Sequence, residues 1–242
     1  MQYSQGRITP EAIMADFTYT QIAKMIDHSL LQQQLADDEM DQGCRLAREY
    51  DVASVCIKPY AVARAKELLA GSTVAVGTTI GFPHGGHVTS IKVAESIQAM
   101  KDGAIELDMV VNIGKVLGKD WAYVKADIRA VVETVHAQKA LVKVIFENCF
   151  LQDEHKQRLC EICGEVGADF VKTSTGYGST GATDDDLKLM RKHSPPNVQV
   201  KAAGGVRNFD RLLVVRSIGV TRVGATASRP ILDECKAFLM KG

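Results

Sequence analysis

The chain has 242 residues, of which 46% are hydrophobic and 24% charged, and its 29 Lys and Arg residues balance its 29 Asp and Glu residues. This length suits one large α/β domain, since a barrel of eight strands and eight helices takes about 250 residues. A net charge of zero argues against a basic nucleic-acid-binding domain, and no apolar run approaches the ~18 residues of a membrane span. We therefore expect neither a nucleic-acid partner nor a membrane partner.

The first residues of the chain and the six cysteines bear on the cellular location of the protein. Residues 1–9 are polar and lack the apolar region of a signal peptide. The six cysteines are scattered over predicted helices and strand ends, which is typical of reduced thiols rather than of a disulfide framework. The sequence therefore predicts a cytoplasmic protein.

In chain order, residues 1–17 are predicted to form an N-terminal extension with a short helix, and residues 18–242 a single domain. In this domain apolar runs alternate with helical patterns. The predicted strands are residues 24–28, 54–57, 74–80, 105–109, 141–146, 169–173, 198–202 and 221–223. The predicted helices are residues 39–50, 60–69, 90–102, 121–138, 152–166, 184–192, 209–217 and 231–240.

The fold class follows from this alternation. Most of the predicted strands are near-continuous apolar runs, as expected for strands buried on both faces of a parallel sheet. Strict alternation without a break in composition indicates one domain. Eight strand–helix units favour a closed (β/α)₈ barrel, the TIM barrel, over an open doubly wound sheet.

Ionisable and reactive side chains collect where the predicted strands end. They are Asp27, Cys56, Asp108, Glu147, Lys172 and Lys201. In a barrel the active site is built at the carboxyl ends of the strands, so these side chains are expected to converge there. For Glu147 we expect an ion pair with a lysine such as Lys143 or Lys58, with a direct role in the chemistry as the alternative.

Two of these residues, Lys172 and Lys201, indicate the type of chemistry. They are one strand–helix unit apart, so they are expected to be neighbours in the sheet. A second positive charge nearby lowers the pKa of a lysine from its free value of about 10.4. A lysine that is neutral near pH 7 is a nucleophile for carbonyl carbon. The pair therefore predicts Schiff-base chemistry.

Five segments carry a resemblance to a known family. They are residues 26–31 (IDHSLL), 79–85 (TIGFPHG), 106–114 (ELDMVVNIG), 170–176 (FVKTSTG) and 200–207 (VKAAGGVR). Together and in this order they are similar to those of the deoxyribose-phosphate aldolases. The resemblance extends over roughly residues 20–240 of the chain.

The resemblance implies a class I aldolase that needs no metal and no cofactor. It implies that Lys172 forms the Schiff base, that Lys201 lowers the pKa of Lys172 and assists proton transfer, and that Asp108 joins the proton relay. The family's reaction is the reversible cleavage of 2-deoxyribose 5-phosphate to glyceraldehyde 3-phosphate and acetaldehyde. A small sugar phosphate is then the expected partner, and a homo-oligomer of two or more copies is the expected assembly.

The candidate substrate-binding residues follow from the same strand ends. Backbone N–H groups after the seventh and eighth strands often bind phosphate in barrels, which points to Gly204, Gly205 and Gly224. The sixth loop adds Thr175 and Gly176. In the first loop, Asp27 and Ser29 either bind a substrate hydroxyl or hold the loops together.

The eighth loop departs from the family's pattern, which usually has paired serines there. Thr226 can replace one of these hydroxyl groups, but Ala227 cannot replace the other. Gln32 also stands where many members have a lysine. Two alternatives therefore stay open: a Schiff-base lyase for a related or non-phosphorylated deoxy sugar, and a barrel that binds a sugar phosphate without turnover.

Overall fold

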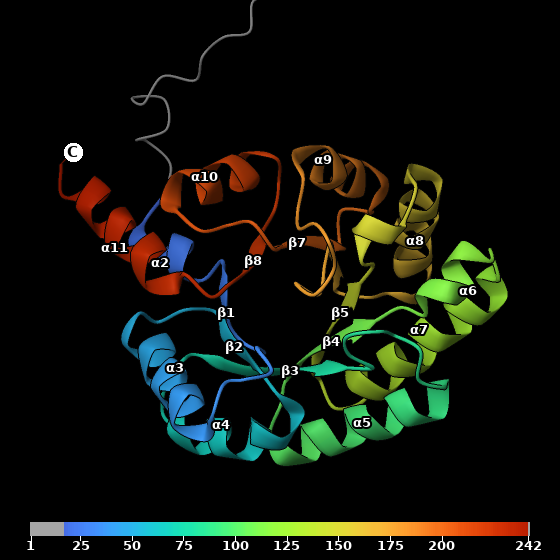
Figure 1. Ribbon diagram of the computed structural model, residues 1–242, viewed down its shortest axis with the longest axis horizontal. Coiled ribbons are helices and arrows are strands. Elements are labelled where there is room, and N and C mark those ends of the chain that lie inside the picture. The colour runs from blue at the N-terminus through green and yellow to red at the C-terminus, as the bar shows by residue number, and fades with distance from the viewer. Residues whose placement is uncertain (1–16, 242) are drawn as a thin grey trace, which may run out of the picture.

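Eight parallel strands close into one barrel in chain order, with β8 pairing back onto β1 (Figure 1). The computed structural model describes residues 17–241. The strands are β1 (Ile26–Leu30), β2 (Ser54–Ile57), β3 (Ala75–Ile80), β4 (Glu106–Val110), β5 (Leu141–Ile145), β6 (Phe170–Lys172), β7 (Gln199–Ala203) and β8 (Arg222–Ala225). The predicted TIM-barrel fold is therefore confirmed.

Helices surround the barrel on its outside (Figure 1). They are α2 (Tyr19–Ala23), α3 (Asp37–Glu49), α4 (Val62–Leu68), α5 (Thr89–Asp102), α6 (Ile113–Leu117), α7 (Trp121–His136), α8 (Asp153–Val166), α9 (Asp184–His193), α10 (Phe209–Ser217) and α11 (Ser228–Leu239). Two short 3₁₀ helices, η1 (Pro59–Ala61) and η2 (Asn148–Phe150), follow β2 and β5. Over the described part of the chain, no helix is long and apolar enough to cross a membrane.

The structure differs from the predicted elements mainly near the amino terminus. The first strand begins at Ile26 rather than at residue 24, because Lys24 ends the short helix α2. The Lys24 Nζ bonds outward to Asp51 and Thr73, at 2.7 Å each. The helices α2 and α6 were not predicted. The proposed extension, residues 1–17, lies outside the described residues except for Phe17.

The apolar core lies between the barrel and its helices. In β5, for example, Val142 and Val144 are fully buried in the same apolar cluster as Val131 and Val135 of α7. Burial of each such side chain contributes about 1.5–3 kcal/mol. Lys143 lies between the two valines in sequence, so it points to the opposite face of the sheet, which is the barrel interior.

The interior of the barrel is charged where the predicted strands suggested an apolar one. Glu106 and Asp108 on β4, Lys143 on β5 and Lys172 on β6 are all buried. Because side chains alternate along a strand, charged residues at every second position reach the same interior space. The barrel thus holds these charges inside, while the apolar side chains that alternate with them on β4 and β5 pack outside, against the helices.

Candidate active site

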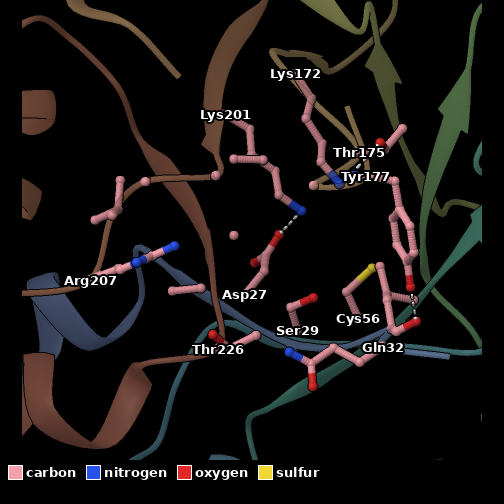
Figure 2. A pocket seen from close by; sticks show the side chains of 18 of the residues that line it. Asp27, Ser29, Gln32, Cys56, Lys172, Thr175, Tyr177, Lys201, Arg207 and Thr226 are labelled. Carbon is pink, nitrogen blue, oxygen red and sulfur yellow. Dashed lines mark hydrogen bonds and ion pairs between the residues drawn. The ribbon is translucent and has the colours of Figure 1, made fainter. Parts of the chain in front are cut away.

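A cavity of about 430 Å³ opens at the carboxyl ends of the strands (Figure 2). Its lining comes from β1, β2, β6, β7 and β8 and from the loops after them. It brings together ten of the eleven residues that the sequence assigns to catalysis or substrate binding: Asp27, Ser29, Lys172, Thr175, Gly176, Lys201, Gly204, Gly205, Gly224 and Thr226. The eleventh, Asp108, is fully buried and bonds to both lysines.

The two lysines are direct neighbours, as the sequence predicts. Lys172 and Lys201 are Cα partners on the adjacent strands β6 and β7. Their Nζ atoms lie 2.8 and 2.7 Å from the same oxygen, Oδ2 of Asp108. Both ammonium groups therefore share one carboxylate oxygen. The negative charge on that oxygen is divided between them.

The pKa values of the two lysines move in opposite directions. Burial lowers the pKa of Lys172 first of all, and the charge of Lys201 lowers it further, although Asp108 opposes both. For Lys201, burial also favours the neutral amine, but Asp108 and Asp27 outweigh it and raise the pKa. Lys172 is therefore the amine more easily deprotonated. The sequence attributes this effect to Lys201 alone, whereas burial is its larger cause.

Asp108 also binds a third lysine, Lys143. The Lys143 Nζ lies 3.0 Å from Oδ1 of Asp108, so both carboxylate oxygens are occupied by ammonium groups. Burial by itself would raise the pKa of Asp108, but Lys143, Lys172 and Lys201 together hold it well below its usual range. Asp108 therefore stays ionised across the neutral pH range.

Two more charged residues complete the network, and sequence reasoning missed both. Arg222 donates from Nε to Oδ1 of Asp27 at 2.7 Å, and its Nη2 lies 2.6 Å from Glu106. Glu106 in turn lies 2.6 Å from Lys143. Glu106 lies two residues before Asp108, and Arg222 is the Cα partner of Lys201. Charged residues at alternate positions within predicted barrel strands were the signal that could have revealed them.

Asp27 belongs to this network rather than to the loops. Its Oδ2 lies 2.5 Å from the Nζ of Lys201, an ion pair marked in Figure 2, and 3.3 Å from that of Lys143. With Arg222 on its other oxygen, this buried carboxylate is occupied by cations. Asp27 therefore holds Lys201 in place, a contact that the sequence did not predict, and it also lines the cavity.

The other polar groups on the β1 and β2 side of the cavity are uncharged. Ser29 and Cys56 both line the cavity, and Figure 2 shows their side chains beside each other. Burial raises the pKa of the Cys56 thiol to about 11. The thiol is therefore protonated at neutral pH and adds no charge beside the lysines.

Tyr177, after β6, joins three loops at the cavity mouth. Its hydroxyl donates to the carbonyl of Leu31 at 2.6 Å, and its ring packs edge-on against Phe82, with centroids 5.5 Å apart. Its backbone N–H donates to the hydroxyl of Thr175 at 3.0 Å. The contacts of Tyr177 with Leu31 and Phe82 hold the sixth loop against the first and the third loops.

The expected ion pair of Glu147 is wrong. Its carboxylate accepts hydrogen bonds from the backbone N–H and the hydroxyl of Thr175. Lys143 bonds inside the barrel instead, and Lys58 donates to the carbonyl of Leu35 at 2.7 Å. Glu147 therefore orients the sixth loop. Buried polar groups need hydrogen-bond partners, and Thr175 supplies the donors for this carboxylate.

The opposite side of the cavity mouth holds the glycines that the sequence suggests for phosphate binding. Gly204 and Gly205 have φ values of +80° and +92°. A Cβ atom on Gly204 would lie 2.8 Å from the Cα of Gly181, so the sixth and seventh loops touch backbone to backbone there. Figure 2 shows Arg207 and Thr226 on this side, with the guanidinium of Arg207 directed toward the cavity. Arg207 was quoted in the sequence motif but not singled out as a site residue.

The eighth loop offers the hydroxyl of Thr226 to the cavity, as the sequence suggests. Ser228 is fully buried, and its hydroxyl lies 2.8 Å from Nδ1 of His28. The Ser228 hydroxyl is therefore turned away from any substrate, and it does not compensate for Ala227.

Comparison with known proteins agrees with this geometry. The model of the DeoC/LacD family aldolases matches residues 21–232. A deoxyribose-phosphate aldolase of Rhodopirellula baltica is 57% identical over 226 residues, which cover 93% of this chain and 94% of that protein. The crystal structure of a putative deoxyribose-phosphate aldolase from Coccidioides immitis aligns with a TM-score of 0.86 and 36% identity, covering 90% of this chain and 87% of that one.

A second solved structure extends the fold comparison. It is described as a unique tetrameric structure of deoxyribose phosphate aldolase from Aeropyrum pernix. It aligns with a TM-score of 0.85 and 24% identity, covering 95% of this chain and 99% of that one. At this identity the likeness supports the barrel fold alone.

Proposed function

The chain belongs to the DeoC/LacD family of aldolases, and from this we propose that it reversibly cleaves 2-deoxyribose 5-phosphate to glyceraldehyde 3-phosphate and acetaldehyde. The Schiff base forms on Lys172. The observation that carries this assignment is that the Lys172 side chain ends in the cavity with a lowered pKa, and that its ion pair is with an oxygen of Asp108 that it shares with Lys201.

The reaction starts with the neutral Lys172 amine. Its Nζ attacks the C1 aldehyde of the open-chain sugar, and loss of water gives an iminium ion. The C2–C3 bond then breaks: its electron pair moves toward the iminium nitrogen, and the C3 hydroxyl passes its proton through water to Asp108 as C3 becomes the aldehyde of glyceraldehyde 3-phosphate. Protonation of the remaining enamine and hydrolysis release acetaldehyde and restore Lys172.

Each of these steps moves a proton, and Asp108 and Lys201 are the groups placed to assist. Asp108 accepts hydrogen bonds from both lysines, so it connects the Schiff-base nitrogen to a permanent ammonium group. Positioned acid–base groups of this kind contribute about 10²–10⁴-fold to the rate. Asp108 carries the C3 proton on to the enamine carbon, and Lys201, whose raised pKa keeps it charged, holds Asp108 in place through its hydrogen bond.

The phosphate group fits the opposite side of the cavity mouth. Gly204 and Gly205 present backbone at close range, and Arg207 is a cation directed into the same space. Thr226 and Gly224 add a hydroxyl and a further backbone position. With the phosphate in this position, Thr175 and Gly176 line the other side of the sugar, and Ser29 contacts a substrate hydroxyl.

Trapping with borohydride tests the assignment. The protein is incubated with 2-deoxyribose 5-phosphate and borohydride, and the reduced adduct is located by peptide mass mapping. An adduct on Lys172, absent from Lys172→Ala, together with release of acetaldehyde without borohydride, is the expected result. An adduct without turnover, or no adduct with any aldehyde, would favour a sugar-phosphate-binding barrel instead.

A second substrate is favoured by one observation, the eighth loop. Ala227 offers no hydroxyl there, and Ser228 is turned to His28, which weakens the grip on a phosphate. Free 2-deoxyribose is the matched test substrate. Equal kcat/KM values for the free and the phosphorylated sugar would assign the chain to a lyase for non-phosphorylated deoxy sugars.

Assembly and location complete the proposal. The protein is proposed to be a homo-oligomer of two or more copies, and light scattering in solution measures its assembly directly. A cytoplasmic location rests on the pattern of the cysteines, which are free thiols in the structure.

A further inference from the structure

The charged network at the barrel floor contains unequal numbers of positive and negative groups. It joins four cationic side chains to three carboxylates: Lys143, Lys172, Lys201 and Arg222 against Asp27, Glu106 and Asp108. All seven are buried or nearly so, with the Arg222 side chain the most exposed at 12%. If every group were ionised, the network would hold one positive charge in excess in a place where an unpaired charge is costly.

The contacts show which cation is the least supported. Lys143 lies within 3.3 Å of all three carboxylates. Lys201 contacts Asp27 and Asp108, and Arg222 contacts Asp27 and Glu106. Among the carboxylates of residues 17–241, Lys172 contacts that of Asp108 alone, through an oxygen that it shares with Lys201.

We propose that Lys143, Glu106 and Arg222 are positioning residues that fix the charge balance of the site, so that the excess positive charge falls on Lys172 and is relieved by loss of its proton. This inference rests on the proposed function, because it concerns the same Schiff-base lysine. It adds three residues that act on the nucleophile without touching the substrate.

Lys143 acts through Asp108. It occupies Oδ1 of that carboxylate and leaves Oδ2 to be divided between Lys172 and Lys201. Without Lys143, Oδ1 would be open as well, and Lys172 and Lys201 would no longer have to share one oxygen. The protonated form of Lys172 would then be better stabilised, since a close opposite charge favours the charged state.

The other titratable groups around the site do not alter this balance. From β2, the Cys56 thiol is protonated at neutral pH because burial raises its pKa to about 11. After β5, the carboxylate of Glu147 is engaged by Thr175, and the contacts of the described residues include no ion pair between Glu147 and the network. After β7, Arg207 lies at the exposed mouth of the cavity.

The same balance supports the carbon–carbon cleavage. Without Lys172 the network has as many cations as carboxylates, so the iminium ion on Lys172 is again the excess charge. Cleavage moves the C2–C3 electron pair toward the iminium nitrogen, and the cation becomes a neutral enamine. The surroundings therefore favour cleavage for the reason that they favour a neutral amine at the start.

Paired substitutions test the charge balance. Lys143→Met removes one cation, and Glu106→Gln removes one carboxylate while keeping its shape. The readout is the rate at which acetaldehyde and cyanoborohydride label Lys172 across a pH series, measured by peptide mass mapping. The midpoint is expected to rise in Lys143→Met and to fall in Glu106→Gln, by about 1 pH unit each.

The double variant and a matched control separate charge from structural damage. Lys143→Met combined with Glu106→Gln restores a single excess cation, so its midpoint is expected to return toward that of the wild type. Lys92→Met is the control, because Lys92 is equally buried and pairs with Asp127 at 2.6 Å, between α5 and α7. It is expected to lower stability and to leave the labelling midpoint unchanged. If Lys143→Met does not fold, Arg222→Met also removes one cation from the network and is used in its place.

The outcomes are distinct. Midpoints of the two single variants that move in the same direction, or that do not move, would overturn the charge balance while labelling of Lys172 in the wild type still supports the aldolase. A double variant displaced as far as either single variant would do the same. No labelling of wild-type Lys172 at any pH would overturn the proposed function and this inference with it.

Discussion

Lys172 and Lys201 are identical side chains on neighbouring strands, and only their surroundings divide the work between them. Lys201 has two carboxylate partners and a raised pKa, whereas Lys172 shares one oxygen and has a lowered pKa. Lys172 is therefore the amine that loses its proton more easily, and Lys201 is the one that keeps it. Two side chains of the same type thus differ in acidity because of their contacts.

Replacement of Lys201 tests this division. In Lys201→Met the positive neighbour of Lys172 is lost and Oδ2 of Asp108 is left to Lys172, so both changes raise the pKa of Lys172. The acidic limb of the kcat/KM profile is expected to move to higher pH, and kcat to fall by about 10²-fold or more. Steady-state kinetics across a pH series measure both. An unchanged acidic limb would show that Lys201 does not control the pKa of Lys172.

Asp108 is expected to matter for both rate and stability. Asp108→Asn removes the carboxylate that three lysines share, and it leaves buried ammonium groups without a counter-charge. We expect kcat to fall by about 10²–10⁴-fold and the free energy of unfolding to fall by about 3–5 kcal/mol. Kinetics and urea unfolding measure the two effects. A variant with full stability would show that the lysines do not depend on this charge.

Arg207 is expected to act on binding alone. The charge-assisted hydrogen bonds that Arg207→Gln removes contribute about 1.5–3 kcal/mol, which corresponds to a rise in KM for 2-deoxyribose 5-phosphate of about 10–100-fold. Free 2-deoxyribose is the control substrate, and its kcat/KM is expected to stay unchanged. A parallel loss with both sugars would place the effect of Arg207 in the loop rather than at a phosphate.

At the scale of the elements, the loops after β1, β3 and β6 are tied together through one side chain. Tyr177 bonds to the carbonyl of Leu31 and packs on Phe82. The loops after β1 and β6 line the cavity, and Tyr177 links them to the loop after β3. This link can therefore be tested by changing a single side chain.

Two substitutions of Tyr177 separate its hydroxyl from its ring. Tyr177→Phe loses one neutral hydrogen bond, worth about 0.5–1.5 kcal/mol, so KM is expected to rise by about 2–10-fold. Tyr177→Ala also loses the aromatic contact and is expected to raise KM further, with kcat less affected in both. Steady-state kinetics measure this order. Equal KM values for Tyr177→Ala and the wild type would mean that the loops after β1, β3 and β6 hold together without this residue.

The sequence predicts the elements that bear the chemistry better than those that do not. Lys172 and Lys201 each close an apolar run, so the run, its end and the lysine are visible together. The helices α2 and α6 have five residues each, too few for an amphipathic period to show. For α2 the signal was its capping box, formed by Thr18 and Gln21.

The charged network escaped sequence reasoning because it depends on register. Lys143, Glu106 and Arg222 are far apart in the chain, and nothing in their local sequence names their partners. They meet because strand alternation turns them inward and barrel closure brings β4, β5 and β8 around one space. The pair of lysines was accessible because two consecutive strands are always neighbours in this fold.

At the scale of the whole molecule, the network ties stability to pH. Burial opposes ionisation of Asp27 and Asp108, but the surrounding cations outweigh it and lower both pKa values. A carboxylate with a lowered pKa in the folded state contributes stability that is complete above its unfolded pKa of about 3.9 and is lost as the pH falls below it.

The free energy of unfolding is therefore expected to be steady near neutral pH and to fall steeply below pH ~4. Urea unfolding at a series of acidic pH values measures the slope, which reports how many more protons the unfolded chain binds. In Asp108→Asn the slope is expected to be shallower, because one of the two groups is gone. The same slope in both proteins would contradict the lowered pKa of Asp108.

The row of Cα partners Lys172, Lys201 and Arg222 fixes how β6, β7 and β8 align along their length. A slip of one strand by a single residue would turn its charged side chain from the barrel interior to the apolar helix layer. A cation buried there without a carboxylate costs on the order of several kcal/mol. The charged side chains of the candidate site thus also favour the correct strand alignment, because a misaligned barrel would bury its lysines without carboxylate partners.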